Sequence, residues 1–501
     1  MMEGLIDGFF TVLEPYHIFI LFLATVIGFW GGALPGISGT MLVIILLPVT
    51  YAMDTVSAFL MLTGIYGASV FSGLISAILF RTPGTPEAVA TVFDGYPMTQ
   101  KGEAGRALGI GVISSAVGGL AGTLALVFLT PLLADVALNF SSPEFFALAF
   151  LGLTVVASLS GKELTKGLIG VCFGLFLATV GMDSMSGTPR FDFNMTNLRT
   201  GIELIPILIG LFAISEIMKK SREDHTLADT VKKVKTKIYD SSIMRRISFT
   251  IGRSSILGTF LGILPGVGAT TASMLGYSEA VRWSKHPENF GKGTPEGIAA
   301  PEAANNSAAM GALVPLLALG IPGSATTAVI LGAFVMHGLQ PGPSLMTNNS
   351  ELVYAIFVGA IFLNLMILIF AKPFISTFVY LMKVPYTILA PFIAVFCIIG
   401  TFAVRNSLFD VWVMLLFGAI GYFFEKARFP MATVILGVVL GPIAESEFRR
   451  SLQMAGGDYL VFVTRPISAI LIGLAIILLL TPLLKKWKQE KHIKKSIDKT
   501  G

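Results

Sequence analysis

Four Pro-Gly pairs interrupt apolar segments of the chain, and hydroxyl side chains flank them. Pro suits the first turn of a helix and Gly tolerates unwound backbone, so each pair predicts a helix that ends and restarts. A restarted helix presents free N–H groups and roughly half a positive charge at its N-terminus, which attracts anions such as carboxylates. The four breaks lie at Pro35-Gly36, Pro83-Gly84, Pro265-Gly266 and Pro322-Gly323.

The residues of these breaks and their small or hydroxylated neighbours form the candidate anion-binding set. Unwound carbonyl groups at the same breaks also offer positions for Na⁺, near Gly36 and Gly266. The alternative is that the breaks are kinks whose backbone groups are satisfied by neighbouring Ser and Thr. Besides the four Pro-Gly pairs, the set contains Ser38, Gly39, Thr40, Thr85, Gly268, Thr270, Ser324 and Thr326.

Asn305 and Asn306 complete the candidate binding set. They lie in the run AANNSAAMGAL, which is expected to be helical and embedded in the membrane. Adjacent amides are costly there unless they are hydrogen-bonded, so we expect them to bind substrate or an ion, with helix–helix contact as the alternative.

Three ionisable positions leave their roles open. Arg81 either clamps a carboxylate or extends to the membrane surface. Asp94 is expected to cap a turn, and His337 to pack rather than to transfer protons. Three glutamates are expected to stabilise half-helix starts or to face water; they are Glu87, Glu296 and Glu302.

The breaks recur in the same order in two halves of the chain. Residues 31–40 read GGALPGISGT and residues 261–270 read LGILPGVGAT, 230 residues later. Residues 82–85 read TPGT and residues 321–324 read IPGS, 239 residues later. Residues 64–81 align with residues 303–320 without a gap, and the extra residues fall in a polar insertion. The sequence therefore predicts an internal repeat.

Composition places the chain in a membrane. Only 13% of its 501 residues are charged and 54% are hydrophobic, whereas soluble domains have roughly 25% charged residues. Long apolar runs approach the roughly 20 residues needed to cross the hydrocarbon core. We therefore expect an all-α polytopic membrane protein with about 11 to 13 transmembrane helices, some of them broken or re-entrant.

The distribution of Lys and Arg predicts the orientation. Residues 219–246 hold nine Lys or Arg against four Asp or Glu, and residues 485–501 hold seven Lys. Both segments are expected in the cytoplasm, with the N-terminus outside. The two halves would then begin on opposite sides of the membrane, as inverted repeats. The expected divisions are a first repeat at 1–218, a basic cytoplasmic linker at 219–250, a second repeat at 251–462 and an extra helix with a cytoplasmic tail at 463–501.

Signatures of other functional classes are missing from the sequence. It has no G-x-x-x-x-G-K-[ST], H-E-x-x-H, C-x-x-C or G-x-S-x-G motif. An enzyme is therefore not expected, and nothing indicates nucleic-acid binding, because orientation and anionic lipid account for the basic tail. No cofactor is expected other than Na⁺ or H⁺ as a coupling ion.

Around these motifs the chain resembles the large membrane subunit of the tripartite tricarboxylate transporters, the TctA family. The resemblance covers essentially the whole length. It is carried by LPGISGT (34–40), TPGTPEAVATVFDGYPMTQKGEAGRALGIG (82–111), LPGVGATTASMLGY (264–277) and FGKGTPEGIAAPEAANNSAAMGALVPLLALGIPGSATTAVILGAFVMHGLQPGP (290–343).

This resemblance implies a permease in the bacterial inner membrane that takes up di- or tricarboxylates, driven by an ion gradient. It implies two partners: a small four-helix membrane subunit (TctB-like) and an extracytoplasmic solute-binding protein (TctC-like). Segregation of the motifs into residues 28–98 and 258–343 favours elevator-like alternating access. The rival classes are a non-transporting scaffold or sensor subunit and an intramembrane enzyme.

Overall fold

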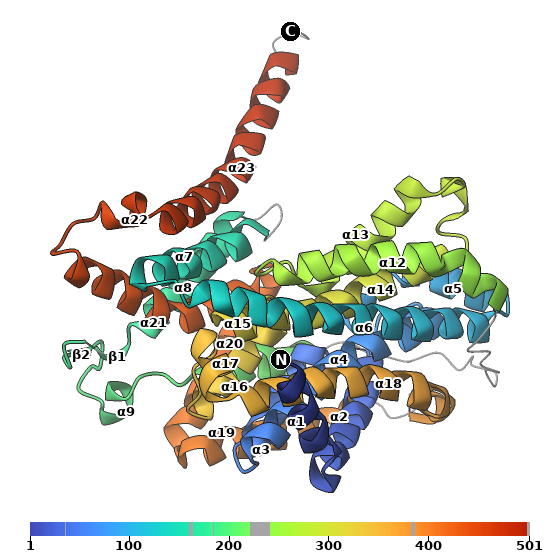
Figure 1. Cartoon of the computed structure of the whole chain (residues 1–501), viewed down its shortest axis with the longest axis horizontal. Coiled ribbons are helices and arrows are strands. Elements are labelled where there is room, and N and C mark those ends of the chain that lie inside the picture. Colours follow the sequence, from blue (N-terminus) through green and yellow to red (C-terminus); the bar gives the residue numbers. More distant parts are fainter. Residues whose placement is uncertain (36, 160–163, 184, 221–240, 382–385, 498–501) are drawn as a thin grey trace. The chain divides into compact units, whose positions relative to one another are not determined.

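The computed structural model describes residues 1–35, 37–159, 164–183, 185–220, 241–381 and 386–497 (Figure 1). The described chain is almost entirely helical, which confirms the expected all-α class. It divides into two compact units: residues 1–138 with 205–422, and residues 139–204 with 423–501. Each unit combines segments from both predicted repeats, so the compact units do not coincide with the repeat boundaries.

The first unit contains the four breaks. Its first half comprises α1 (Met2–Leu13), α2 (Pro15–Ala33), α3 (Gly39–Thr50), α4 (Thr55–Phe80), η1 (Pro86–Ala88), α5 (Val92–Gln100) and α6 (Ala104–Ala137). It continues with α10 (Leu204–Leu208), a π-helical turn η3 (Ile209–Ile214), α11 (Ser215–Lys220), α12 (Ser241–Ile263), α13 (Gly268–Trp283), η4 (Pro287–Asn289), α14 (Glu296–Gly311), α15 (Leu313–Leu319) and α16 (Ala325–Met336). The remaining helices are α17 (Pro343–Asn348), α18 (Ser350–Leu381), α19 (Tyr386–Arg405) and most of α20 (Leu408–Lys426).

Equivalent helices of the two halves pack in equivalent ways. Helix α2 packs on α4, and α12 packs on α14. A Cβ atom on Gly28 of α2 would collide with the Ile65 carbonyl, and one on Gly258 of α12 would collide with the Ala304 carbonyl. Gly258 and Ala304 follow Gly28 and Ile65 by the same 230 and 239 residues that separate the two sets of motifs. The predicted repeat therefore recurs in the packing.

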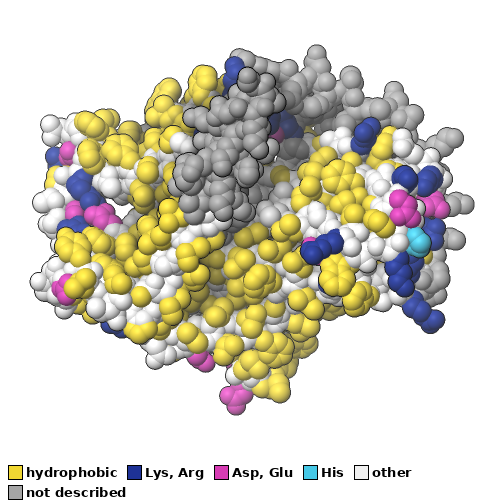
Figure 2. Space-filling model, turned by 90° about the horizontal axis from the view of Figure 1, so that it is seen from above, with side chains coloured by type: hydrophobic (Ala, Val, Ile, Leu, Met, Phe, Trp, Pro, Cys, Tyr) yellow, Lys and Arg dark blue, Asp and Glu magenta, His cyan; other side chains and the backbone are white. Residues whose placement is uncertain are grey.

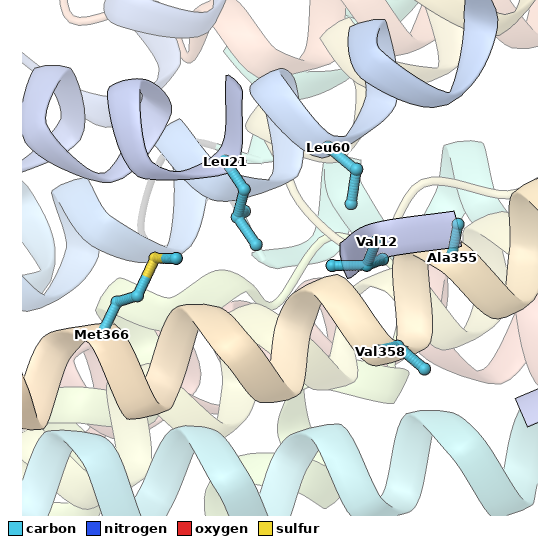
Figure 3. Packing of buried hydrophobic residues seen from close by; sticks show 6 residues of the cluster. All are labelled: Val12, Leu21, Leu60, Ala355, Val358 and Met366. Atoms are coloured by element: carbon cyan, nitrogen blue, oxygen red, sulfur yellow. The ribbon is translucent and has the colours of Figure 1, made fainter. Parts of the chain in front are cut away.

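Two long helices flank these pairs. Helix α6 lies along α14 and α12, as Figure 1 shows, while α18 lies along α4 and α2. The N-terminal helix α1 packs on α18, where Val12 meets Ala355 and Val358 in an apolar cluster (Figure 3). The same cluster includes Leu21, Leu60 and Met366, so it joins α1, α2, α4 and α18.

The second unit is held together by small residues. It contains α7 (Ser142–Leu159), α8 (Leu164–Ala178), a hairpin of β1 (Gly181–Met182) and β2 (Pro189–Arg190), α9 (Thr196–Arg199), α21 (Met431–Met454), α22 (Val461–Thr464) and α23 (Pro466–Ile497). Gly170 and Gly174 of α8 face Thr433 and Gly437 of α21 so closely that an added Cβ would collide. Such spacing of small residues lets two membrane helices approach backbone to backbone.

Seven described helices are long and apolar enough to cross a membrane, so the chain is a multi-pass membrane protein. They are Pro15–Ala33, Thr55–Phe80, Ala104–Ala137, Ser350–Phe378, Ile388–Arg405, Leu408–Lys426 and Met431–Met454. Hydrophobic side chains cover much of the face in Figure 2, and charged side chains gather in a few groups. Five further apolar helices have 10 to 17 described residues. The predicted count of about 11 to 13 spans would require these shorter helices to cross as well, so it stays a prediction.

Candidate functional site

Two of the Pro-Gly breaks produce helix starts with hydroxyl caps. Helix α2 ends at Ala33, and α3 restarts at Gly39 after Ser38, whose hydroxyl accepts a hydrogen bond from the Met41 N–H at 3.1 Å. Helix α16 starts at Ala325 after Ser324, which forms a capping box with Thr327. Ser is favoured at this position because its oxygen satisfies a free N–H group of the first turn.

The starts of α3 and α16 meet inside the first unit. The hydroxyl oxygens of Thr40 and Thr326, each the second residue of its helix, are 2.7 Å apart. Tyr66 of α4 joins them, with its hydroxyl 3.3 Å from the Ser324 hydroxyl. All four side chains are buried or nearly so. Two helix N-termini and several neutral hydroxyl groups at one place suit a small anion.

The third and fourth breaks are joined through their backbones. The Gly266 N–H donates to the Gly323 carbonyl at 2.9 Å. Gly266 and Gly268 have φ angles of 79° and 68°, which only Gly adopts without strain. Pro265 and Thr270 are partly exposed beside them, whereas Pro322 is buried.

The second break packs in the same way as the fourth. A Cβ on Gly84 would collide with the Gly32 carbonyl, and a Cβ on Gly323 would lie 2.7 Å from the Gly262 carbonyl. Thr85, next to Gly84, is 1% exposed, and its hydroxyl has no hydrogen-bond partner among the described residues. The second break thus packs against Gly32 of α2, and the fourth break packs against Gly262 of α12, the equivalent helix of the second half. Pro83 is partly exposed.

Contacts between the halves are reciprocal. Tyr66 on α4 reaches Ser324 at the fourth break, and Asn305 on α14 donates its amide to the Glu87 carbonyl beside the second break at 3.2 Å. Asn305 is the residue that aligns with Tyr66 in the repeat. Such exchange is expected of two copies related by an approximate two-fold axis.

Asn305 and Asn306 are buried and hydrogen-bonded. The Asn306 amide donates to the Asn305 side-chain oxygen at 2.7 Å and to the Glu302 carbonyl at 3.0 Å. The structure therefore brings together Thr40, Thr326 and Ser324, and joins Asn305 to the second break. Gly36, which belongs to the candidate set and to the predicted Na⁺ position, lies outside the described residues. The candidate Na⁺ position near Gly266 stays a prediction.

The expectation for Glu302 was wrong. Glu302 neither starts α14 nor faces water: it lies in the second turn, is 0% exposed, and accepts hydrogen bonds from Thr91 and Ser115. Glu296, in contrast, does begin α14 and pairs with Arg246 at 2.6 Å. Sequence alone could not separate the two glutamates, because helix α14 contains few strongly apolar residues.

Two further residues beside the site were not anticipated. Tyr66 could have been found, because it lies opposite Asn305 in the gap-free alignment of the halves. Lys220 was assigned to the cytoplasmic linker, yet its side chain is 8% exposed and its ammonium donates to the Pro35 carbonyl at 2.9 Å. No sequence signal distinguished Lys220 from the other basic residues that follow it.

The structure shows the contacts of the three ionisable residues whose roles the sequence left open. Asp94 is buried and accepts from the Tyr277 hydroxyl and from three backbone N–H groups of the polar insertion, so it anchors that loop. Arg81 ends α4 in a left-handed conformation, and its exposed guanidinium lies 5.9 Å from the Tyr96 ring. His337 lies 5.7 Å from the Phe59 ring, which fits a packing role.

The second unit offers a different kind of site. A cavity of about 380 Å³ there is lined almost entirely by apolar side chains, with Glu445 at its edge. Glu445 and Asp183 pair with Arg190 and Arg449. An anion has no free helix start or hydroxyl cluster to bind in this cavity, so the candidate site is the junction in the first unit.

One known protein family matches the part of the chain that contains these motifs. The profile of the family described as "Tripartite tricarboxylate transporter TctA family" matches residues 18–436. This range includes all four breaks, α14 and the helices that flank them.

Two relatives come from Agrobacterium vitis. The chain is 38% identical over 481 residues to the "Uncharacterized 52.8 kDa protein in TAR-I ttuC' 3'region", covering 96% of each chain. It is 39% identical over 234 residues to the "Uncharacterized protein in TAR-II ttuC' 3'region", covering 47% of this chain and 97% of that one. No solved structure matches the chain significantly.

Proposed function

We propose that this chain, which belongs to the tripartite tricarboxylate transporter TctA family, is the permease subunit that moves small carboxylates, di- or tricarboxylates, across the membrane. The single observation that supports the position of the substrate is the meeting of the α3 and α16 N-termini at Thr40 and Thr326. Two positive helix ends attract a carboxylate, and neutral hydroxyl groups bind it without holding it as tightly as an Arg or Lys pair would.

Substrate would bind where the starts of α3 and α16 meet, beside Thr40, Thr326 and Ser324. Thr85, two residues before the Glu87 carbonyl that Asn305 contacts, adds a buried hydroxyl group. Lys220 pairs with Glu216 at 3.6 Å and donates to the Pro35 carbonyl at 2.9 Å, so it fixes the backbone of the first break. A substrate with two or three carboxylate groups can contact several of these donors at once.

Elevator-like alternating access is the transport mechanism we propose. The two motif-bearing segments, residues 28–98 and 258–343, exchange reciprocal hydrogen bonds. This connection supports their movement as one body against the other helices. Structures in which these segments stay fixed while the remaining helices rock would contradict the mechanism.

Further subunits and a coupling ion complete the proposed transporter. The family description, "tripartite", supports further subunits, for which we propose a small four-helix TctB-like membrane subunit and an extracytoplasmic TctC-like solute-binding protein. We further propose symport with Na⁺ or H⁺ in the bacterial inner membrane. The basic segments at 219–246 and 485–501 support an outside N-terminus and an inside C-terminus.

Uptake of radiolabelled citrate or succinate into membrane vesicles tests the function. Vesicles contain the full chain and its membrane partner, purified binding protein is added outside, and Na⁺ is replaced by choline in a parallel sample. Accumulation that needs the chain supports a permease. Absence of uptake for every carboxylate under every ion gradient would favour a scaffold or sensor subunit, or an intramembrane enzyme. A thermal-shift screen of the binding protein against carboxylates identifies which substrate to label.

A further inference from the structure

The Glu302 carboxylate is a buried acid without a compensating positive charge. Its side chain is 0% exposed, and its two oxygens accept hydrogen bonds from the hydroxyl groups of Thr91 and Ser115, the latter at 2.9 Å. No Lys, Arg or His among the described residues forms an ion pair with it. Three elements hold this group: α14, the turn before α5, and α6.

Charged groups on the neighbouring elements are engaged elsewhere. Helix α4 carries none, and Asp94 of α5 is bonded to Tyr277 and the polar insertion. Arg106 of α6 pairs with Glu103 at 3.3 Å, and Arg253 of α12 donates to the Glu279 carbonyl at 3.3 Å. On α13, Glu279 also pairs with Arg282.

Glu87 is the second acid at this junction. Asn305, one turn after Glu302 on α14, donates to the Glu87 carbonyl at 3.2 Å, which places η1 beside this part of α14. The Glu87 Oε2 atom is buried and has no hydrogen-bond partner among the described residues, and neither does the hydroxyl of Thr85, two residues before it. The two carboxyl groups therefore lie among neutral hydroxyl groups, with no positive charge bonded to either of them among the described residues.

An ionised carboxylate removed from water is strongly unfavourable unless a positive charge compensates it. Hydroxyl donors reduce this penalty but do not neutralise the charge. A second carboxylate nearby, and then an anionic substrate, would increase the repulsion. The acid must therefore carry a proton or contact a cation, and oxygen atoms of carboxylates and hydroxyls are suitable ligands for Na⁺.

We propose that Glu302, assisted by Glu87, binds the monovalent cation, H⁺ or Na⁺, whose gradient drives transport; this rests on the proposed function. The cation would reach the Glu302 carboxylate from one side of the membrane together with substrate, and leave to the other side after substrate release. Its charge would offset that of Glu302 while the anion is bound. Asn305 connects α14, which carries Glu302, to the Glu87 carbonyl beside the second break. Without the cation, the ionised Glu302 carboxylate would repel the anionic substrate and so oppose its binding.

Chemical labelling of the wild-type chain tests the cation site directly. The hydrophobic reagent dicyclohexylcarbodiimide reacts with protonated, buried carboxyl groups, and peptide mass spectrometry locates the product. We expect Glu302 to be labelled, with a rate that falls when Na⁺ is added at constant pH or when pH is raised. Protection by Na⁺ indicates a Na⁺ site, and dependence on pH alone indicates a proton site. No product at Glu302, or a rate that neither Na⁺ nor pH changes, would overturn the proposal.

Transport measurements on Glu302→Gln separate coupling to the ion gradient from binding of the carboxylate substrate. The neutral side chain keeps the hydrogen-bonding shape but cannot gain or lose a proton and binds Na⁺ poorly. We expect loss of gradient-driven accumulation, with exchange of internal for external carboxylate retained. Glu296→Gln on the same helix is the matched control, since Glu296 pairs with Arg246 near the surface, and it should retain both activities.

The two proposals fail in different ways. If the wild-type chain moves no carboxylate, the proposed function fails, and the labelling result still decides whether Glu302 binds a cation. If Glu302→Gln accumulates substrate as the wild type does, the cation site is wrong while the permease stands. If Glu302→Gln does not reach the membrane, labelling of the wild type decides alone.

Discussion

The Thr40 and Thr326 hydroxyl groups are 2.7 Å apart, although 286 residues separate them in the chain. Each lies in the first turn of a helix that restarts after a Pro-Gly break, so the contact brings two helix N-termini from different halves together. Their combined positive potential is the physical basis of the proposed carboxylate site.

Removing either hydroxyl should weaken uptake. In Thr40→Val the Thr326 hydroxyl loses its buried partner at nearly unchanged side-chain volume, which costs about 1–3 kcal/mol, or roughly a 5- to 150-fold loss of uptake efficiency. Thr40→Ser should retain most activity. Thr63→Val is the matched control, because the buried Thr63 hydroxyl bonds to its own helix at the Phe59 carbonyl. Initial rates of labelled carboxylate uptake against concentration measure the effect, and equal rates in Thr40→Val and wild type would contradict it.

The second and fourth breaks should be intolerant of a single added methyl group. Gly84→Ala and Gly323→Ala would force Cβ atoms against the Gly32 and Gly262 carbonyls, and overpacking of this kind destabilises by about 1–3 kcal/mol. We expect lower unfolding temperatures in detergent and reduced uptake for both. Gly252→Ala should be neutral or stabilising, because no atom lies within 4 Å of its added Cβ. A normal unfolding temperature in both break variants would show that the breaks are more adaptable than this packing indicates.

Asn305→Ala should abolish uptake while leaving membrane insertion intact. The substitution removes the donor to the Glu87 carbonyl and the acceptor for the Asn306 amide, so two buried polar groups lose partners inside the site. Asn348→Ala, on an exposed short helix, is the control. Uptake and the amount of protein in the membrane fraction are measured together. Normal transport by Asn305→Ala would remove this residue from the site.

The hairpin of the second unit should loosen at low pH. Hydrogen bonds from the Arg449 guanidinium and from the N–H groups of Ser186 and Met185 hold the pKa of Asp183 well below its usual range. A lowered pKa in the folded state means that this stabilisation is fully present above the ordinary value of about 3.9 and is lost as pH falls below it. Hydrogen-exchange protection factors of residues 181–190 should therefore decrease below about pH 4.

Asp183→Asn provides the comparison for that measurement. The amide cannot form the charged pair with Arg449, so protection of the hairpin should already be low at neutral pH and should change little on acidification. Equal pH profiles in wild type and Asp183→Asn would show that another group controls the hairpin.

Sequence alone determined the class of the protein, the positions of the breaks and the repeat. Composition indicated a membrane protein, because a chain with so few charged residues lacks the polar surface of a soluble protein. Pro and Gly end helices through local backbone preferences, so Pro35 and Pro322 located their breaks without any knowledge of distant contacts. The regular offset between the motifs predicted an internal repeat.

Tertiary structure decided which of these residues meet and which acids are buried. The partner of Thr40, the exchange between Tyr66 and Asn305, and the surroundings of Glu302 all depend on helices that are far apart in the chain. Local sequence could not distinguish Glu302 from Glu296, or Lys220 from the basic residues that follow it. Burial of a charge is set by the elements that pack around it, and that packing is a property of the folded chain as a whole.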